Sequence, residues 1–245
     1  MSPRLVRQCV RESRKLVILL LLPPVRVQRL KKLVKSEFYI TIVRYLSIYS
    51  VLLPLGNLLY HKARSTRVTN LMLTLCAVSL FSDLLLQILA SHSLNNFPVI
   101  NIFLFAQFAI LFSIFAEKEK SKFIFVLFIF LIFFNAVDFL ILHSPGTFNS
   151  YSAYSNGLFM TVLSLRGMYG LIKEMNSKKI QSLPFFWLFF GVLLYYAGTI
   201  FLFLFNNYLV EYFSTSYASI WVLHNLLNTS KNLLFFVTTW KIFGT

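Results

Sequence analysis

Polar side chains crowd the last long apolar segment of the chain, residues 217–240. They recur at spacings of three and four residues: Trp221, His224, Asn225, Asn228, Lys231 and Asn232. Side chains at this spacing share one face of a helix. Because lipid does not solvate such groups, the stripe must face the interior of a helix bundle or a water-filled cavity.

Further polar and charged side chains interrupt three earlier apolar segments, residues 68–90, 97–116 and 122–142. They are Asp83, Gln87, Asn101, Gln107, Asn135 and Asp138. An unpaired charge in the middle of a bilayer costs about 2.5–3.5 kcal/mol on insertion scales. We therefore expect Lys231 to pair with Asp83 or with Asp138.

Together these groups predict one polar pocket in the outer half of a membrane bundle. Its expected lining is Asp83, Gln87, Asn101, Gln107, Asn135, Asp138, His224, Asn225, Asn228 and Lys231. Hydrogen bonds among Asn, Gln and Ser side chains also join membrane helices to one another, at about 0.6–2 kcal/mol each. Two interpretations stay open: the groups only join helices, or they also line a site for a ligand or an ion.

Signatures of enzymes and metal sites are missing from the sequence. There is no H-E-x-x-H, G-x-G-D or histidine-box spacing, and the four histidines, His61, His92, His143 and His224, lie in different segments. A lysine in the last span also attaches retinal in microbial rhodopsins. Here, however, Leu227 stands one turn before the lysine, where those proteins have an acid, and residues 97–116 contain no acid. We expect no enzymatic activity, no cofactor and no metal.

The segments that position these groups are long enough to cross a bilayer. Of the 245 residues, 58% are apolar and only 13% are charged. A hydrocarbon layer about 30 Å thick needs about twenty residues of helix, and residues 123–134 lack the alternation of a barrel strand. We predict an all-α polytopic membrane bundle of seven transmembrane helices, with a kink at Pro54 in the first. The expected spans are 38–60, 68–90, 97–116, 122–142, 151–175, 184–206 and 217–240.

Lysine and arginine are confined to alternate links between these spans. The links after the first, third and fifth spans carry Lys62, Arg64 and Arg67, then Lys118, Lys120 and Lys122, then Lys173, Lys178 and Lys179. The links after the second, fourth and sixth spans carry neither residue type. Because basic links stay in the cytoplasm, we expect the N-terminus of the bundle outside and the C-terminus inside.

Residues 1–36 differ in character from the rest of the chain. They hold ten basic residues and no Phe, whereas residues 37–245 hold all 28 Phe. A leader this basic would by itself keep the N-terminus in the cytoplasm, which contradicts the orientation that the links predict. We expect this leader to be disordered, or to form an amphipathic helix on anionic lipid. A native start near Glu37 is a third interpretation, and residues 37–245 are the expected transmembrane domain.

Two stretches of the chain carry a family resemblance. The first is Asn95-Asn96-Phe97-Pro98 with Asn101-Ile102-Phe103 and Gln107-Phe108; the second is Leu223-His224-Asn225 with Asn228 and Lys231-Asn232-Leu233-Leu234-Phe235. They resemble an uncharacterised family of small seven-helix bacterial integral membrane proteins. The resemblance implies a bundle in the bacterial inner membrane and assigns no role to any residue.

Two classes of function follow. The first is a sensor or interaction module, whose pocket binds a ligand and whose basic links, including residues 117–120, contact a cytoplasmic signalling partner. The second is a transporter or channel for small solutes or ions. The first is favoured because ionisable groups thin out towards the inner half and no internal repeat is visible. Nucleic acid is not an expected partner, since the charge of +15 depends heavily on the leader.

Overall fold

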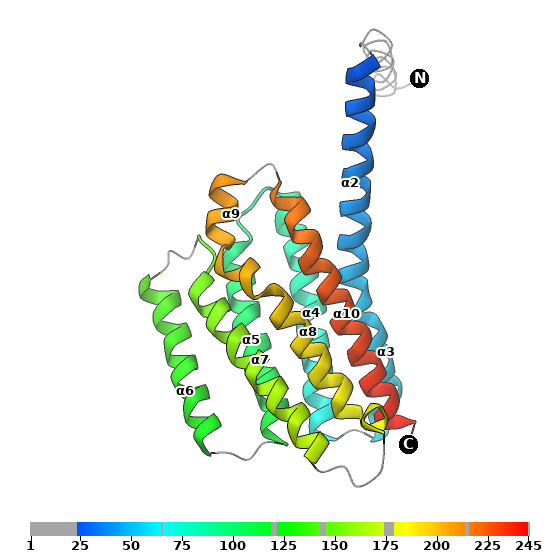
Figure 1. The fold of residues 1–245 in the computed structure, drawn as a ribbon, viewed down its shortest axis with the longest axis vertical. Coiled ribbons are helices and arrows are strands. Elements are labelled where there is room, and N and C mark those ends of the chain that lie inside the picture. The colour runs from blue at the N-terminus through cyan, green and yellow to red at the C-terminus, as the bar shows by residue number, and fades with distance from the viewer. Residues whose placement is uncertain are drawn as a thin grey trace. The chain divides into compact units, whose positions relative to one another are not determined.

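The computed structural model describes residues 24–64, 66–118, 122–142, 146–173, 179–213 and 216–244, apart from the side chains of residues 24–36 and 142. The described residues are mostly helical and include no strand, which confirms the all-α class (Figure 1). They divide into two compact units, Met1–Ile42 and Val43–Thr245. In the first unit, residues 24–36 of the predicted leader are helical, and residues 1–23 lie outside the described chain.

The helix bounds follow the predicted spans closely. The helices are α2 (Pro24–Ser50), α3 (Leu52–Tyr60), α4 (Arg67–Ser91), α5 (Phe97–Ala116), α6 (Lys122–Val137), α7 (Ser150–Lys173), α8 (Pro184–Leu204), α9 (Asn206–Tyr212) and α10 (Tyr217–Phe243). Short 3-10 turns η1 (Lys62–Arg64) and η3 (Ile180–Ser182) occupy two links, and a π-helical segment η2 (Asp138–Leu142) continues α6.

The first long helix is interrupted three residues before Pro54. α2 ends at Ser50 and α3 begins at Leu52, so Val51 separates them. Pro54 has no N–H to donate to the carbonyl of Ser50, and the helix loses that bond. The interruption at Val51 lies where the sequence predicts a kink at Pro54. The π-helical end of α6 and the separate helix α9 are features that the predicted spans did not include.

Within the described part of the chain, five helical segments are long and apolar enough to cross a membrane. They are Glu37–Tyr60, Arg67–Ser91, Phe97–Ala116, Lys122–Ile141 and Pro184–Leu204. The two other long helices, α7 and α10, carry too many polar side chains to meet the same criterion of composition. The fold is therefore compatible with a multi-pass membrane protein.

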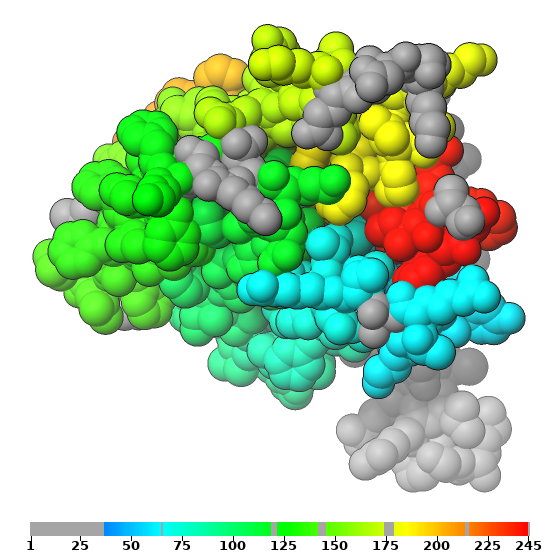
Figure 2. All heavy atoms as spheres, turned by 90° about the horizontal axis from the view of Figure 1, so that it is seen from below, coloured from blue at the N-terminus to red at the C-terminus, as the bar shows by residue number. Residues whose placement is uncertain are grey.

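Within the second unit, the basic links share one end of the bundle. The C-terminal ends of α3, α5, α7 and α10 lie there together (Figures 1 and 2). We call this face the basic end; its described cationic residues are Lys62, Arg64, Arg67, Lys118, Lys122, Lys173, Lys179 and Lys241. An ion pair between Arg67 Nε and Glu117 Oε1, at 3.0 Å, joins the start of α4 to the end of α5.

Three side-chain hydrogen bonds join α10 to the first helical segment. Asn228 Nδ2 donates to Ser47 Oγ (2.9 Å), Asn232 Nδ2 to Ser50 Oγ (2.8 Å), and Asn57 Nδ2 to Thr239 Oγ1 (2.8 Å). The partners ascend in the same order along both segments, so the two segments run parallel. Part of the polar stripe on α10 therefore serves helix association.

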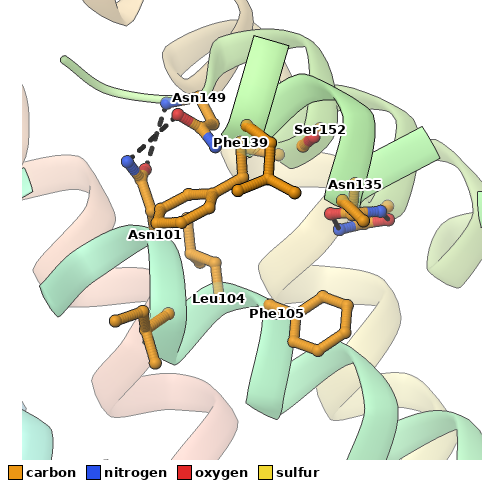
Figure 3. Close-up of a pocket in the computed structure, with 12 residues that line it drawn as sticks. Asn101, Leu104, Phe105, Asn135, Phe139, Asn149 and Ser152 are labelled. Atoms are coloured by element: carbon orange, nitrogen blue, oxygen red, sulfur yellow. Dashed lines mark hydrogen bonds between the residues drawn. The ribbon is translucent and has the colours of Figure 1, made fainter. Parts of the chain in front are cut away.

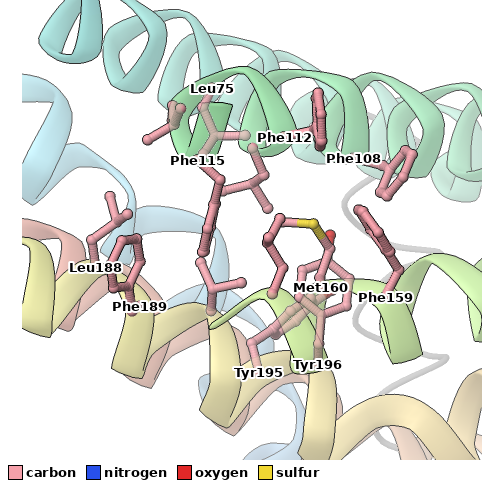
Figure 4. Packing of buried hydrophobic residues seen from close by; sticks show 14 of the residues in the cluster. Leu75, Phe108, Phe112, Phe115, Phe159, Met160, Leu188, Phe189, Tyr195 and Tyr196 are labelled. Atoms are coloured by element: carbon pink, nitrogen blue, oxygen red, sulfur yellow. The ribbon is translucent and has the colours of Figure 1, made fainter. Parts of the chain in front are cut away.

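An apolar core of large side chains fills the space between α4, α5, α7 and α8 (Figure 4). Phe115 stacks on Phe189 with ring centroids 4.7 Å apart, and Met160 and Leu188 are fully buried beside them. Phe112 stacks on Phe128 of α6 at 3.6 Å, and Phe108 meets Phe159 of α7 edge-on at 5.9 Å. Aromatic packing of this kind contributes beyond the area that it buries.

A glycine permits the close approach of α8 to α10. A Cβ on Gly191 would lie 3.2 Å from Leu234 Cβ and 3.4 Å from the Phe235 ring. Gly191→Val is expected to lower the free energy of unfolding by about 1–3 kcal/mol, because the added methyl groups overpack the contact. The matched change Gly56→Val meets nothing within 4 Å on α3 and should have almost no effect. Thermal unfolding in detergent measures both; equal effects would contradict the close contact.

Candidate functional site

A cavity lies between α5, the α6–η2 junction and α7 (Figure 3). Its volume is about 280 Å³. One wall is polar and buried, formed by Asn101, Asn135, Asn149, Ser152 and Asn156. The other wall is apolar, formed by Ile102, Leu104, Phe105, Ala136, Phe139, Leu140 and Ala153. We call the polar side the amide wall.

Hydrogen bonds with the turn before α7 position one half of the amide wall. Asn101 Nδ2 donates to the carbonyl of Thr147 (2.9 Å) and to Asn149 Oδ1 (3.1 Å). The Asn149 backbone N–H donates in return to Asn101 Oδ1 at 3.0 Å. Asn95 and Asn207 donate to the carbonyls of Gly146 and Phe148, each at 2.9 Å. The turn is therefore held by three separate parts of the chain.

A reciprocal amide pair forms the other half of the amide wall. Asn135 Nδ2 on α6 donates to Asn156 Oδ1 at 2.9 Å, and Asn156 Nδ2 on α7 donates to Asn135 Oδ1 at 2.7 Å. Asn135 Nδ2 also donates to the carbonyl of Leu131 at 2.6 Å. Since each amide group has two N–H donors, Asn156 retains one donor beyond those used in this pair.

Asp138 lies behind the amide wall and is fully buried. Its Oδ2 accepts from the backbone N–H of Ser152 at 3.1 Å and also accepts from the Ser152 hydroxyl. Ser152 is in the first turn of α7, where backbone N–H groups lack helical acceptors and the helix dipole favours negative charge. The carboxylate is thus stabilised by the start of α7, and Asp138 is also the first residue of the π-helical segment.

A second polar group lies on α10, which contributes no residue to the cavity lining. Lys231 is only 4% exposed, and its Nζ lies 4.4 Å from the centroid of the Tyr195 ring. Asp83 on α4 interacts electrostatically with Lys231 and is half-buried. The ring of His224 packs edge-on against Tyr195, with centroids 5.7 Å apart. We call Asp83, Tyr195, His224 and Lys231 the ionic cluster.

Three buried polar atoms on the helices of the ionic cluster make no hydrogen bond within the described chain. His224 Nδ1 and Trp221 Nε1 lie on α10, and Gln87 Nε2 lies one turn beyond Asp83 on α4. Nearby, Gln107 Nε2 donates to the hydroxyl of Tyr196 at 3.2 Å. The cluster therefore holds the charge of Asp83 near that of Lys231 and contains side chains with spare hydrogen-bonding capacity.

The structure divides the ten residues of the predicted pocket among three places. Asn101 and Asn135 line the cavity, with Asp138 directly behind it; Asp83 and Lys231 form the ionic cluster with His224, and Gln107 and Gln87 lie on the helices beside it. Asn228 binds Ser47, and Asn225 accepts a hydrogen bond from Thr229 through its carbonyl at 2.8 Å. Of the two acids that the sequence offers to Lys231, Asp83 is the one whose charge acts on it.

Four site residues were not among those predicted from the sequence: Asn149, Ser152, Asn156 and Tyr195. The first three recur at spacings of three and four residues at the start of α7, the same signal that identified the stripe on α10. These three residues could therefore have been predicted from their spacing in the sequence. Tyr195 carries no comparable signal, because nothing in an apolar stretch distinguishes one tyrosine from the next.

Comparisons with protein-family models, with curated proteins and with solved structures find no match. Among the described residues no cluster of three or more His, Cys, Asp or Glu side chains could hold a metal ion. The chemistry available at the cavity is therefore hydrogen bonding by uncharged amides, with one carboxylate already bound to the start of a helix.

Proposed function

We propose that the chain crosses a membrane seven times, α7 and α10 being spans as well. Their 24 and 27 residues measure about 36 and 40 Å at about 1.5 Å per residue, enough for a bilayer. Several of their polar side chains form hydrogen bonds with other helices. α10 runs parallel to the segment of α2 and α3 that it contacts. Two parallel spans must be separated by an odd number of intervening crossings, and seven spans place five between the first and the last.

The gathering of basic links supports an orientation as well. Cationic links that share one end of a bundle are what the positive-inside rule requires of the cytoplasmic side. We place the basic end in the cytoplasm and the cavity in the outer half. The bacterial inner membrane is the proposed location, as the family resemblance implies.

Within that membrane, the proposed activity is that of a sensor or interaction module that binds a small ligand in the cavity. The observation that carries this proposal is that the cavity ends blindly. Immediately beyond Leu104 and Phe105, the rings of Phe108 and Phe112 on α5 pack against Phe128 of α6 and Phe159 of α7. Such a site can hold a ligand, but it offers no polar path towards the basic end.

The basic end is the proposed contact for a cytoplasmic signalling partner. Its exposed lysines and arginines suit an acidic surface. The ion pair of Arg67 with Glu117 joins that end to α5, which lines the cavity. α5 runs without interruption from Asn101 in the amide wall to the basic end, so a displacement at the wall can be transmitted along this helix to the partner.

Reconstitution in liposomes tests this function. The purified chain is expected to carry no K⁺, proton or glycerol flux above that of protein-free liposomes, because the aromatic packing closes the cavity. Dye and stopped-flow assays of these three probes provide the measurement. Flux that requires the chain and is abolished by Asn156→Leu, but not by the exposed control Ala77→Trp on α4, would establish transport and refute the sensor.

A further inference from the structure

The mouth of the cavity faces sideways rather than along the bundle. Ile102 and Leu140, which border it, are 61% and 76% exposed, and Phe105 and Ala136 are exposed beside them. The residues of the amide wall on the opposite side are buried; Asn156, for example, is only 4% exposed. In a span, exposed apolar side chains contact acyl chains, so this mouth opens onto the hydrocarbon layer.

The helix on one side of the mouth is attached to the bundle along a narrow strip. Only Ile124, Leu131 and Asn135 of α6 are buried, and its other described side chains are at least partly exposed. In Figure 1, α6 lies at the edge of the bundle. The opening between α5 and α6 is therefore flanked by a helix that few contacts hold in place.

The amide wall favours an uncharged polar group. Asn149 Oδ1 accepts from Asn101 while the two donors of its Nδ2 stay available, and Asn156 keeps one donor as well. None of the described residues that line the cavity is cationic, and Asp138 is already bound by Ser152. An anionic head group would be buried without a counter-charge, and that is costly.

We propose that the ligand of this cavity is a neutral amphiphile that enters from the bilayer between α5 and α6. Its hydroxyl, amide or carbonyl head binds the amide wall, and its apolar chain leaves through the mouth past Ile102 and Leu140. The volume of about 280 Å³ equals that of about nine waters in the liquid, which suits a head group and the first carbons of a chain. This inference rests on the proposed function, because it identifies the ligand of the same site.

Photolabelling in nanodiscs tests the ligand class. The full chain is embedded in phosphatidylcholine with a monoacylglycerol that carries a diazirine on its acyl chain, and labelled peptides are located by mass spectrometry. Labels are expected on Ile102, Phe105 and Leu140. Ala136→Trp, which places an indole in the mouth, should lower this labelling about tenfold, the equivalent of about 1.4 kcal/mol. Ala77→Trp adds the same bulk to an exposed site on α4 and should leave it unchanged.

Three outcomes would overturn the inference. One is equal labelling of wild type and Ala136→Trp, which is the behaviour of ordinary annular lipid. Another is stronger labelling by a diazirine fatty acid than by the monoacylglycerol, which would contradict a neutral head. The third is a water-soluble ligand that raises the thermal stability of wild type but not of Asn156→Leu, while the monoacylglycerol leaves the cavity unlabelled. In that last case the ligand class is wrong and the proposed sensor function stands, since only the flux assay decides against it.

Discussion

Asp83→Asn is expected to lower the free energy of unfolding by about 3 kcal/mol, because it withdraws a nearby opposite charge from the buried Lys231 ammonium. The substitution preserves the shape of the side chain but withdraws the negative charge that faces Lys231. Lys231 is almost completely buried, and the Tyr195 ring 4.4 Å away compensates only part of a desolvated ammonium charge. Unfolding of the purified chain in mixed detergent measures the loss.

A double-mutant cycle separates the pair from its surroundings. Lys231→Met alone is expected to cost less than Asp83→Asn, because the carboxylate that it leaves behind is only half-buried. The double variant should recover most of the stability, since no unpaired charge remains. Glu211→Gln, a neutralised acid on the exposed surface of α9, is the matched control and should change stability by less than about 0.5 kcal/mol. Additive losses in the double variant would show that the two charges do not interact.

The helices could be predicted from the sequence because lipid imposes a simple requirement. About twenty apolar residues are needed for each crossing, and a helix satisfies its own backbone there. α5 begins at Phe97 and ends at Ala116, as the apolar run does. The π-helical segment after Val137 could not be predicted this way, since apolar composition does not distinguish it from the α-helix that it continues.

Which polar groups meet could not be predicted from spacing alone. Spacing shows that Asn135 and Asp138 share a face of one helix, but the neighbour of that face is decided by packing with distant segments. The sequence therefore grouped Asn101 with Lys231 in one pocket, whereas the structure places Asn101 against Asn149 and Lys231 against Tyr195. Asp83 could be considered as a partner of Lys231, alongside Asp138, because charge complementarity is visible in a sequence.

Asp138→Leu is expected to have the second large effect, a loss of about 3 kcal/mol in the free energy of unfolding. It removes the acceptor of both the Ser152 N–H and the Ser152 hydroxyl, and each buried donor left unsatisfied costs about 1–3 kcal/mol. It also removes the negative charge at the first turn of α7. Asp138→Asn retains one oxygen in the same place and should lose about 1 kcal/mol. Thermal unfolding measures both variants.

The same pair of variants connects stability to the cavity. Ser152 lines the cavity and is held by Asp138, so the leucine variant should misplace part of the amide wall, whereas the asparagine variant should preserve it. Photolabelling by the diazirine monoacylglycerol is therefore expected to fall in Asp138→Leu at temperatures where that variant is still folded, and to persist in Asp138→Asn. Leu140→Ala, on the same π-helical segment but 76% exposed, should change stability by less than about 0.5 kcal/mol. If the leucine variant were as stable as this control, Asp138 would not be what holds the start of α7, and the local account of the cavity would be wrong.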